Sequence, residues 1–388
     1  MRVAIFGGSF DPVHSEHIAL VQKAIQSLHL DELIVMPAST PPHKKGKERT
    51  EDFHRLRLCE IAFSGMDKVR VSDYEIAKGG TSYTYLTCRY FREQYPTAQL
   101  FWLVGTDMLR DFPTWKNTDE ILSLVTLAVC ARDEKAGWLQ REKRDFYEKF
   151  QRDFAVINYN GKPVSSTEIR VLAGAGMEIP SVPDGVYDYI KKHKLYEIKN
   201  ADKALSLQTP KRVAHSIRVA VLASEKASKM GISEKKAITA SLFHDCAKYL
   251  SLDAPLLKGF ALNKEWGEVP SAVLHQFTGA YLAESAFGIA DREILDAIRF
   301  HTSGRENMTE LGKLIFLADM VEEERNFDGV DILRKLFFEK KGAGALDKCL
   351  AEALKQTVEY LEIKGAEIYP LTLKAYEFYR RKDYGNDE

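Results

Sequence analysis

The chain has 388 residues, of which 45% are hydrophobic, so it is long enough to form two or three domains with packed cores. Its 55 basic and 56 acidic side chains give a formal net charge of −1, which argues against nucleic acid or an anionic membrane surface as the partner and favours small molecules. The five cysteines show no CxxC spacing, which argues against a disulfide framework and a thiolate zinc site. No apolar run approaches the ~20 residues that a membrane span needs. Together these features predict a cytoplasmic setting.

The N-terminus predicts a strand, a glycine turn and a helix carrying two histidines. Residues 3–6 are apolar, Gly7 and Gly8 follow them, and from residue 18 apolar positions recur at helical spacing. Paired glycines let a backbone pass close to a phosphate, and the free N–H groups at a helix start attract anions. Because His14 and His17 lie three residues apart, they share a helix face and can both meet that anion.

Five further strands are predicted in the first half, at 33–36, 69–72, 100–104, 124–130 and 156–158. A loop with two prolines follows the first of these and carries His43 and Lys44, which could face a ligand, although a solvated basic loop explains it as well. Asp107 follows the strand at 100–104 and suits either a ribose hydroxyl or a helix N-cap. The charged segment 133–152 is predicted to be a solvated helix.

Residues 165–170 read Ser-Ser-Thr-Glu-Ile-Arg and begin another helix. Their hydroxyls can cap the helix or bind phosphate, and Arg170 adds a fixed cation. Strands that alternate with helices predict an α/β doubly wound parallel sheet. No GxGxxG follows the first strand and no GxxxxGK[ST] occurs, so dehydrogenase, kinase and GTPase functions lose their main support.

In this order, the motifs of residues 1–197 resemble the bacterial nicotinate-nucleotide adenylyltransferases of the HxGH superfamily. The resemblance rests on Gly7-Gly8-Ser9-Phe10-Asp11-Pro12 with His14 and His17, Pro41-Pro42-His43-Lys44, Ser82-Tyr83-Thr84, Gly105-Thr106-Asp107, Trp115 and Ser165-Ser166-Thr167-Glu168-Ile169-Arg170. It implies a Rossmann-like nucleotidyltransferase fold. It also implies that the phosphate of nicotinate mononucleotide attacks the α-phosphorus of Mg²⁺-bound ATP, releasing pyrophosphate and deamido-NAD. Such a transfer needs positioning and charge neutralisation.

The resemblance gives each of these motifs a role. His14, His17 and Arg170 would be the catalytic residues that hold the reacting phosphates. Asp107 would bind the ATP ribose, and Thr84 with Trp115 would bind the nicotinate ring. The full set of implied ATP- and substrate-binding residues is Gly7, Gly8, Ser9, Phe10, Lys44, Thr84, Gly105, Asp107, Trp115, Ser166, Thr167 and Arg170.

One position departs from the pattern of that family. The family usually reads HxGH, whereas Glu16 stands here at the glycine position. Because a carboxylate repels nearby phosphates, we expect Glu16 to point away from them or to engage a cation.

The second half changes to successive amphipathic helices, after a closing helix at 182–196 and a polar linker at 198–209. Helices are predicted at 212–229, 233–249, 271–287, 293–301 and 311–324 and after 346, which predicts an all-α domain over 210–388 with a site between facing helices.

Four histidines and two aspartates recur among the apolar positions of these helices: His215, His244, Asp245, His275, His301 and Asp319. A single buried histidine is usually a satisfied core residue, but burying the whole set without partners or metal would be costly. Histidine and carboxylate without thiolate suit iron, manganese, cobalt or zinc better than calcium.

The order of these six residues resembles the HD-domain phosphohydrolases, and the flanks at 242–248, 274–275, 300–304 and 318–325 resemble their YqeK type. The resemblance implies a dinuclear metal centre, most simply of iron, that hydrolyses diadenosine tetraphosphate (Ap4A) symmetrically to two ADP. One metal would be held by His215, His244, Asp245 and Asp319, with Asp245 bridging and catalytic, and the other by His275 and His301. The implied phosphate contacts are Lys248, Thr302 and Arg325, although helix capping is an equal explanation for Thr302.

Together, the two halves predict a bifunctional enzyme. The alternative is that only one half is catalytic and the other is a nucleotide-sensing module. The preference between nicotinate and nicotinamide mononucleotide, the identity of the metals and the oligomeric state are left open by the sequence.

Overall fold

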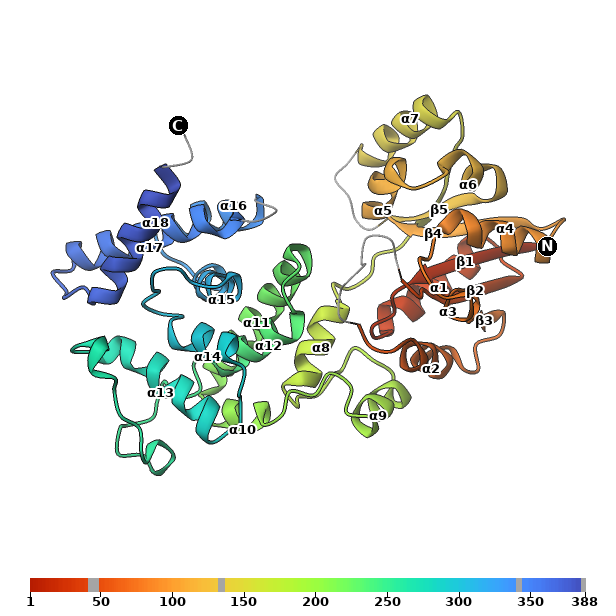
Figure 1. The fold of residues 1–388 in the computed structure, drawn as a ribbon. Coiled ribbons are helices and arrows are strands. Elements are labelled where there is room, and N and C mark those ends of the chain that lie inside the picture. The colour runs from red at the N-terminus through yellow and green to blue at the C-terminus, as the bar shows by residue number, and fades with distance from the viewer. Residues whose placement is uncertain (41–48, 132–136, 340–343, 385–388) are drawn as a thin grey trace. The chain divides into compact units, whose positions relative to one another are not determined.

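The computed structural model describes residues 1–40, 49–131, 137–339 and 344–384, and the chain divides into two compact units (Figure 1). The first unit comprises Met1–Ile169 and Ile179–Leu195, and the second comprises Arg170–Glu178 and Tyr196–Glu388. Lys44 lies outside the described residues.

The first unit is built on a six-stranded sheet in the order β3-β2-β1-β4-β5-β6, in which every neighbouring pair is parallel. The strands are β1 Arg2–Gly8, β2 Glu32–Pro37, β3 Val69–Val71, β4 Gln99–Gly105, β5 Thr126–Ala131 and β6 Ala155–Asn158. The predicted doubly wound parallel fold is therefore confirmed. Strand order reverses between β1 and β4, and in such sheets ligands bind at the carboxyl ends of the strands on either side of this reversal.

The helices of the first unit connect these strands and cover the sheet. They are α1 Ser15–Ser27, α2 Asp52–Phe63, α3 Tyr74–Lys78, α4 Thr84–Gln94, α5 Thr106–Asp111, η2 Phe112–Thr114, α6 Thr118–Leu124, α7 Trp138–Phe150 and α9 Asp184–Lys192, whereas α8 Ser166–Gly174 begins in this unit and continues into the second. Alternate strand residues such as Ile5 and Trp102 share one buried core with Phe91 of α4 and Phe146 of α7. The charged helix α7 is thus not fully solvated, because it buries Trp138 and Phe146.

The second unit contains helices and no strand among its described residues, so the prediction of an all-α second half is confirmed. The helices are α10 Ala201–Ser206, α11 Pro210–Met230, α12 Glu234–Phe243, η3 Pro255–Leu257, η4 Lys264–Trp266, α13 Ser271–Ser285, α14 Arg292–Arg299, α15 Glu310–Val321, α16 Val330–Glu339, α17 Ala345–Ile363 and α18 Pro370–Tyr384. Five of them begin at a side chain that accepts a hydrogen bond from a free N–H of the first turn, namely at Thr209, Ser233, Asn263, Asp291 and Thr309.

The predicted linker is partly helical. Residues 201–206 form α10, and Ala204 and Leu205 on this helix are buried in the core of the second unit. The domain boundaries at 197 and 210 stay a prediction.

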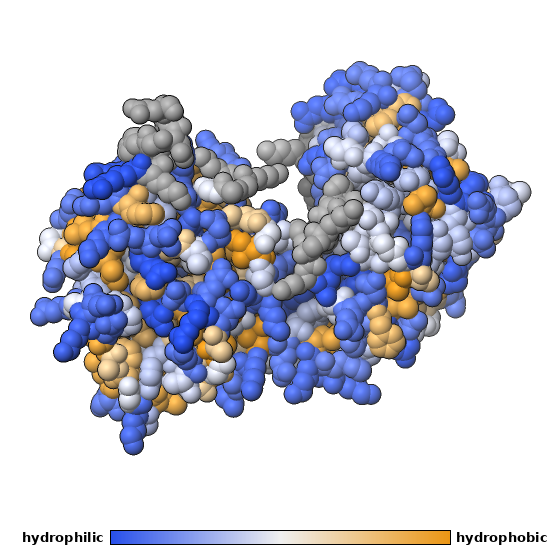
Figure 2. All heavy atoms as spheres, in the orientation of Figure 1, coloured by the Kyte–Doolittle hydropathy of each residue, from blue (hydrophilic) through white to orange (hydrophobic). Residues whose placement is uncertain are grey.

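The visible surface is mostly hydrophilic, with separate hydrophobic patches (Figure 2). Among the described residues, no helix has both the length and the apolar character needed to cross a membrane. All five cysteines are buried and none forms a disulfide, in keeping with the lack of a disulfide framework.

Candidate active sites

The first predicted site begins where β1 ends. Gly7 and Gly8 are the last two residues of this strand. A Cβ on Gly7 would lie 3.1 Å from the indole of Trp102, and one on Gly8 would lie 3.0 Å from the ring of Phe10. Glycine is therefore needed here so that the turn can pack closely against two aromatic rings.

His14 and His17 lie at the start of α1, at the N-cap and the third helical position. Their rings stack with centroids 3.7 Å apart. The backbone N–H of His14 donates to Nδ1 of His17 at 3.2 Å, so the neutral His17 ring carries its proton on Nε2. The phosphate role predicted for His17 requires such a donor.

Glu16 lies between the two histidines, in the first turn of α1. Its Oε2 accepts a hydrogen bond from the hydroxyl of Tyr159, which follows β6, at 2.5 Å. The sequence led us to expect a cation or an orientation away from the phosphates. The structure provides a neutral donor where a cation could have stood, and the orientation relative to the phosphates stays a prediction. A carboxylate in a first helical turn is also stabilised by the helix dipole.

The remaining predicted ligands of the first unit lie at strand ends and helix starts. Thr84 begins α4, and Trp115 directly follows η2, where its ring packs 5.3 Å from that of Phe112. A Cβ on Gly105, at the end of β4, would lie 2.7 Å from Oδ1 of Asp107, so the carboxylate lies over the glycine.

The start of α8 reaches the loop that precedes His14. The hydroxyl of Ser166 donates to the carbonyl of Pro12 at 3.0 Å, which brings two of the predicted phosphate motifs together. One turn later, Nη2 of Arg170 lies 2.7 Å from Oε2 of Glu234, and both residues belong to the second unit. The structure thus gives Arg170 an acidic partner, and its contact with ATP stays a prediction, as does that of Thr167.

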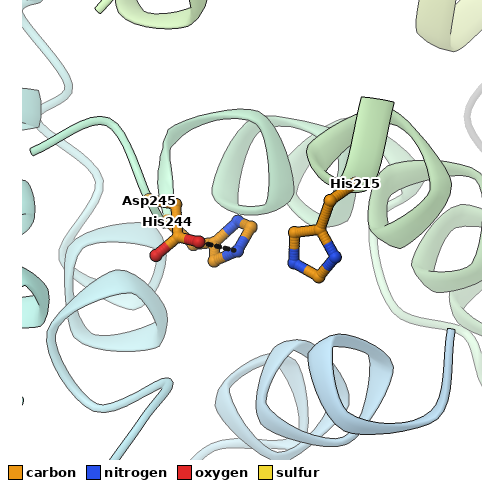
Figure 3. A group of neighbouring side chains, drawn as sticks. All are labelled: His215, His244 and Asp245. Carbon is orange, nitrogen blue, oxygen red and sulfur yellow. Dashed lines mark ion pairs between the residues drawn. The ribbon is translucent and has the colours of Figure 1, made fainter. Parts of the chain in front are cut away.

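The second predicted site gathers six side chains from α11, α13, α15 and the turns after α12 and α14. Three groups of possible metal ligands occur among the described residues, and within each group the ligand atoms lie within 4.8 Å of one another. Each pair of groups has one residue in common, which is His244, Asp245 or His301, so the three groups merge into one cluster. In Figure 3 the imidazole of His215, on α11, lies near that of His244, which directly follows α12, with the Asp245 carboxylate beside His244. The merged cluster consists of His215, His244, Asp245, His275, His301 and Asp319.

Asp245 lies at the centre of this cluster with its side chain fully buried. Its Oδ1 is 3.2 Å from Nε2 of His275 and 3.5 Å from Nε2 of His301. Its Oδ2 is 3.3 Å from Nε2 of His244. At the far side of the cluster, Nε2 of His215 lies 2.9 Å from Oδ1 of Asp319. One carboxylate therefore joins three imidazoles, and the other approaches the fourth.

Three of the four histidines have a fixed orientation. Nδ1 of His244 lies 2.6 Å from the carbonyl of Ser241, and Nδ1 of His301 lies 2.7 Å from the carbonyl of Ile298. Because a carbonyl can only accept, Nδ1 is protonated in both rings and Nε2 faces the cluster. Nδ1 of His215 lies 3.1 Å from a carboxylate oxygen of Glu322 instead.

The protonation states of His301 and Asp245 also suit metal binding, whereas the pKa of His244, which burial alone would lower, is raised by the neighbouring Asp245 carboxylate. Burial lowers the pKa of His301 to about 4, so this ring is neutral near pH 7. Burial alone would raise the pKa of Asp245, but the adjacent His244 and the hydrogen bonds with His275 and His301 hold it well below its usual range. A neutral imidazole and an ionised carboxylate are the forms that coordinate a metal.

Three buried atoms of the cluster make no hydrogen bond, namely His215 Nε2, His244 Nε2 and Asp245 Oδ2. Each of these atoms lies 2.9–3.3 Å from another charged or ligand group. Buried polar atoms without hydrogen bonds are costly, so this donor set fits a transition metal. The structure thus supports a metal site in the second unit.

Cations surround the carboxylates of the cluster. Nζ of Lys248 lies 3.2 Å from Oδ1 of Asp245, and Arg325 forms an ion pair with Asp319. The hydroxyl of Thr302 lies 3.2 Å from Nε2 of His275. All three were predicted to contact phosphate, and that role stays a prediction.

One charged neighbour of the cluster was not expected from the sequence, namely Arg212, whose Nη1 lies 2.9 Å from Oδ2 of Asp245. Its position three residues before His215 on one helix face could have indicated it.

Each half of the chain matches a known protein family. A family described as cytidylyltransferase-like matches residues 5–172, and the HD domain family matches residues 212–324. A probable nicotinate-nucleotide adenylyltransferase of Clostridium tetani is 37% identical over 197 residues, which cover 50% of this chain and 98% of that protein.

At least two relatives match both halves together. A probable nicotinate-nucleotide adenylyltransferase/Ap4A hydrolase of Mycoplasma genitalium is 27% identical over 325 residues, which cover 84% of this chain and 88% of that protein. Among solved structures, a predicted HD superfamily hydrolase involved in NAD metabolism from Clostridium acetobutylicum is 34% identical, with a TM-score of 0.42, and the match covers 47% of this chain and 95% of that one. The chain therefore belongs, through its N-terminal half, to the nicotinate-nucleotide adenylyltransferase family, and it carries an HD domain in its C-terminal half.

Proposed function

We propose that the chain is a bifunctional enzyme that transfers the adenylyl group of ATP to nicotinate mononucleotide and hydrolyses Ap4A to two ADP. The observation that carries the second activity is the buried cluster of four histidines and two aspartates in an HD domain. The first activity is supported by the 37% identity over 197 residues and by the histidine pair at the start of α1.

In the transferase half, the reaction is an in-line displacement at the α-phosphorus of Mg²⁺-bound ATP. The chain supplies donors and positive potential there, because Nε2–H of His17 and the free N–H groups of α1 lie at the same helix end. These groups stabilise the charge that develops on the phosphate oxygens as pyrophosphate leaves. Ser166, Thr167 and Arg170 would hold the triphosphate, Asp107 the ribose, and Thr84 with Trp115 the nicotinate ring.

In the hydrolase half, His215, His244, Asp245 and Asp319 would hold one metal ion, and His275 and His301 with Asp245 a second. Bound ions would supply a water of lowered pKa and a clamp on the scissile phosphate. Iron is proposed, with manganese, cobalt and zinc as alternatives. Lys248, Arg325 and Arg212 would neutralise the polyphosphate, since all three already face carboxylates of the cluster.

Two assays on one preparation test this proposal. With ATP and Mg²⁺, pyrophosphate release is measured with nicotinate mononucleotide and, separately, with nicotinamide mononucleotide. Metal content is measured on anaerobically purified protein, and the products of Ap4A are separated by chromatography. We expect about two ions per chain and ADP as the sole nucleotide product. If only one half is active, the other half is better explained as a nucleotide-sensing module.

Glu322 is predicted to strengthen metal binding through His215. Burial would raise its pKa, but the hydrogen bonds from Arg218 and from the backbone of Glu324 hold the pKa below its usual value, so the carboxylate is ionised and fixes Nδ1–H of His215. We expect Glu322→Gln to weaken the affinity for Mn²⁺ about 10–100-fold in a chelator competition. Glu323→Gln, on the exposed neighbour, is the control, and equal affinities in both variants would contradict the prediction.

Tyr159 is predicted to keep the Glu16 carboxylate away from the substrate phosphates. Without the phenol hydroxyl, this carboxylate loses the hydrogen bond that holds it, and it can repel ATP by about 1 kcal/mol, or about fivefold in affinity. We therefore expect Tyr159→Phe to raise KM for ATP about fivefold, and Glu16→Gln in the same background to reverse the change. Tyr147→Phe, at an exposed position on α7, should leave KM unchanged.

A further inference from the structure

We propose that Arg55 is a positioning residue of the adenylyl-transfer site, whose guanidinium fixes the shape of the turn between β1 and α1. The inference rests on the proposed transferase function. Arg55 lies on α2, its side chain is fully buried, and its guanidinium bonds to Ser9, Ala38, Thr50 and Asp52 rather than to a histidine of the site. It would act through the backbone that carries them.

The guanidinium donates to three backbone carbonyls that follow β1 and β2. Nη1 donates to Ser9 at 2.6 Å, Nη2 to Ala38 at 2.6 Å, and Nε to Thr50 at 3.2 Å. The charge is balanced by Asp52, whose Oδ1 is 2.5 Å from Nη2. A buried arginine is tolerated only when its donors are satisfied in this way. The three backbone carbonyls that accept these hydrogen bonds are therefore held in place by the guanidinium.

The contact with Ser9 sets the orientation of one peptide plane. The Ser9–Phe10 bond is trans, so its N–H points opposite to its carbonyl. Because the carbonyl of Ser9 points at Arg55, the N–H of Phe10 points away from Arg55. The backbone donor of Phe10, one of the implied ATP-binding residues, is thus directed by a residue on another helix.

Phe10 needs this support because its φ is 46°, in the left-handed region that non-glycine residues rarely adopt. The strain costs about 1–2 kcal/mol and must be held by surrounding contacts. Arg55 holds the preceding peptide. The Phe10 ring is 2% exposed and packs edge-on at 5.0 Å from the ring of His17. A change in the turn would therefore also move the histidine.

Further bonds connect the same turn to the chain after β2. The N–H of Ala38 donates to the carbonyl of Gly8 at 2.8 Å, and the N–H of Thr50 donates to Oδ2 of Asp11 at 3.3 Å. Arg55 thus reaches both segments that hold the turn. A lysine offers one nitrogen on a flexible stem and cannot bind three separate carbonyls with the planar geometry of a guanidinium.

The test compares Arg55→Ala and Arg55→Lys with Arg57→Ala in the full chain. Arg57 lies on the same helix, is exposed and pairs with Glu60, so it is a matched control. We expect kcat/KM for pyrophosphate release to fall about 100-fold in Arg55→Ala, about 10-fold in Arg55→Lys and less than twofold in Arg57→Ala. Ap4A hydrolysis by the same samples should be unchanged, and added methylguanidine should restore part of kcat in Arg55→Ala only.

Amide hydrogen exchange gives a readout that does not depend on activity. Peptides covering residues 7–17 should exchange faster in Arg55→Ala than in the unmodified chain, with the strand at 99–105 unaffected. The proposal is overturned if kcat/KM stays within threefold and exchange is unchanged, or if protection is lost over the whole first unit, which would indicate a purely structural role. If the unmodified chain releases no pyrophosphate, the transferase function fails, and the exchange comparison still decides the role of Arg55.

Discussion

Asp245→Ala is expected to reduce Ap4A hydrolysis by on the order of 10⁴-fold while leaving pyrophosphate release intact. Asp245 is the carboxylate that joins the imidazoles of His244, His275 and His301, so its loss removes a ligand from both halves of the cluster. It also leaves Arg212 and Lys248 without their buried counter-charge, which disfavours the entry of a cation. We expect the purified variant to contain little metal.

The measurement is ADP formation by chromatography, together with metal analysis of the same sample. Asp253→Ala is the matched control, because Asp253 is exposed and lies eight residues further along the same unit. Asp245→Asn removes the charge of the side chain but keeps its volume. We expect this variant to lose nearly as much Ap4A hydrolysis as Asp245→Ala, since an amide cannot replace an ionised ligand. A parallel loss of pyrophosphate release in either Asp245 variant would show that the two sites are not independent.

The central strands of the first unit were predictable because they are apolar runs that are largely buried between helix layers. The runs at 33–36 and 100–104 correspond to β2 and β4 within one residue at each end. Helix α2 was not predicted, because Arg55 stands on its buried face together with Leu58 and Cys59 and interrupts the apolar period. Arg55 therefore makes the helix hard to predict, and it also connects the helix to the turn after β1.

The helix predicted at 233–249 ends in the structure at Phe243. His244 and Asp245 lie in the tight turns that follow, where Cys246 N–H donates to the carbonyl of Phe243. The apolar run around these residues continues past the helix end because the turns are buried, so periodicity alone could not place the boundary.

The six residues of the metal cluster could be proposed from the sequence, but their partners could not. Glu322 belongs to a run of three glutamates that reads as a solvated charge cluster. In the structure Glu322 is 3% exposed and contacts His215, whereas Glu323 and Glu324 are exposed. Which of three identical side chains is buried depends on the packing of α15 against α11, and this is tertiary information.

His17→Ala is expected to reduce pyrophosphate release about 10³-fold and to leave Ap4A hydrolysis unchanged. The ring has a fixed orientation: Nδ1 accepts from the backbone of His14, one face stacks on the His14 ring, and the Phe10 ring meets it edge-on. Its Nε2–H is therefore a preorganised donor, and such donors contribute most where charge develops in the transition state.

The variants His17→Gln and His29→Asn distinguish the loss of this hydrogen-bond donor from a general effect on folding. Glutamine can place an amide N–H near the position of Nε2, so we expect it to recover about 10-fold of the loss, mainly in kcat. His29 is exposed and has a φ of 49°, which asparagine adopts readily, so His29→Asn should match the unmodified chain. If His17→Ala raised KM for ATP but left kcat unchanged, His17 would contribute only uniform binding, and stabilisation of the transition state would have to come from other groups at the start of α1.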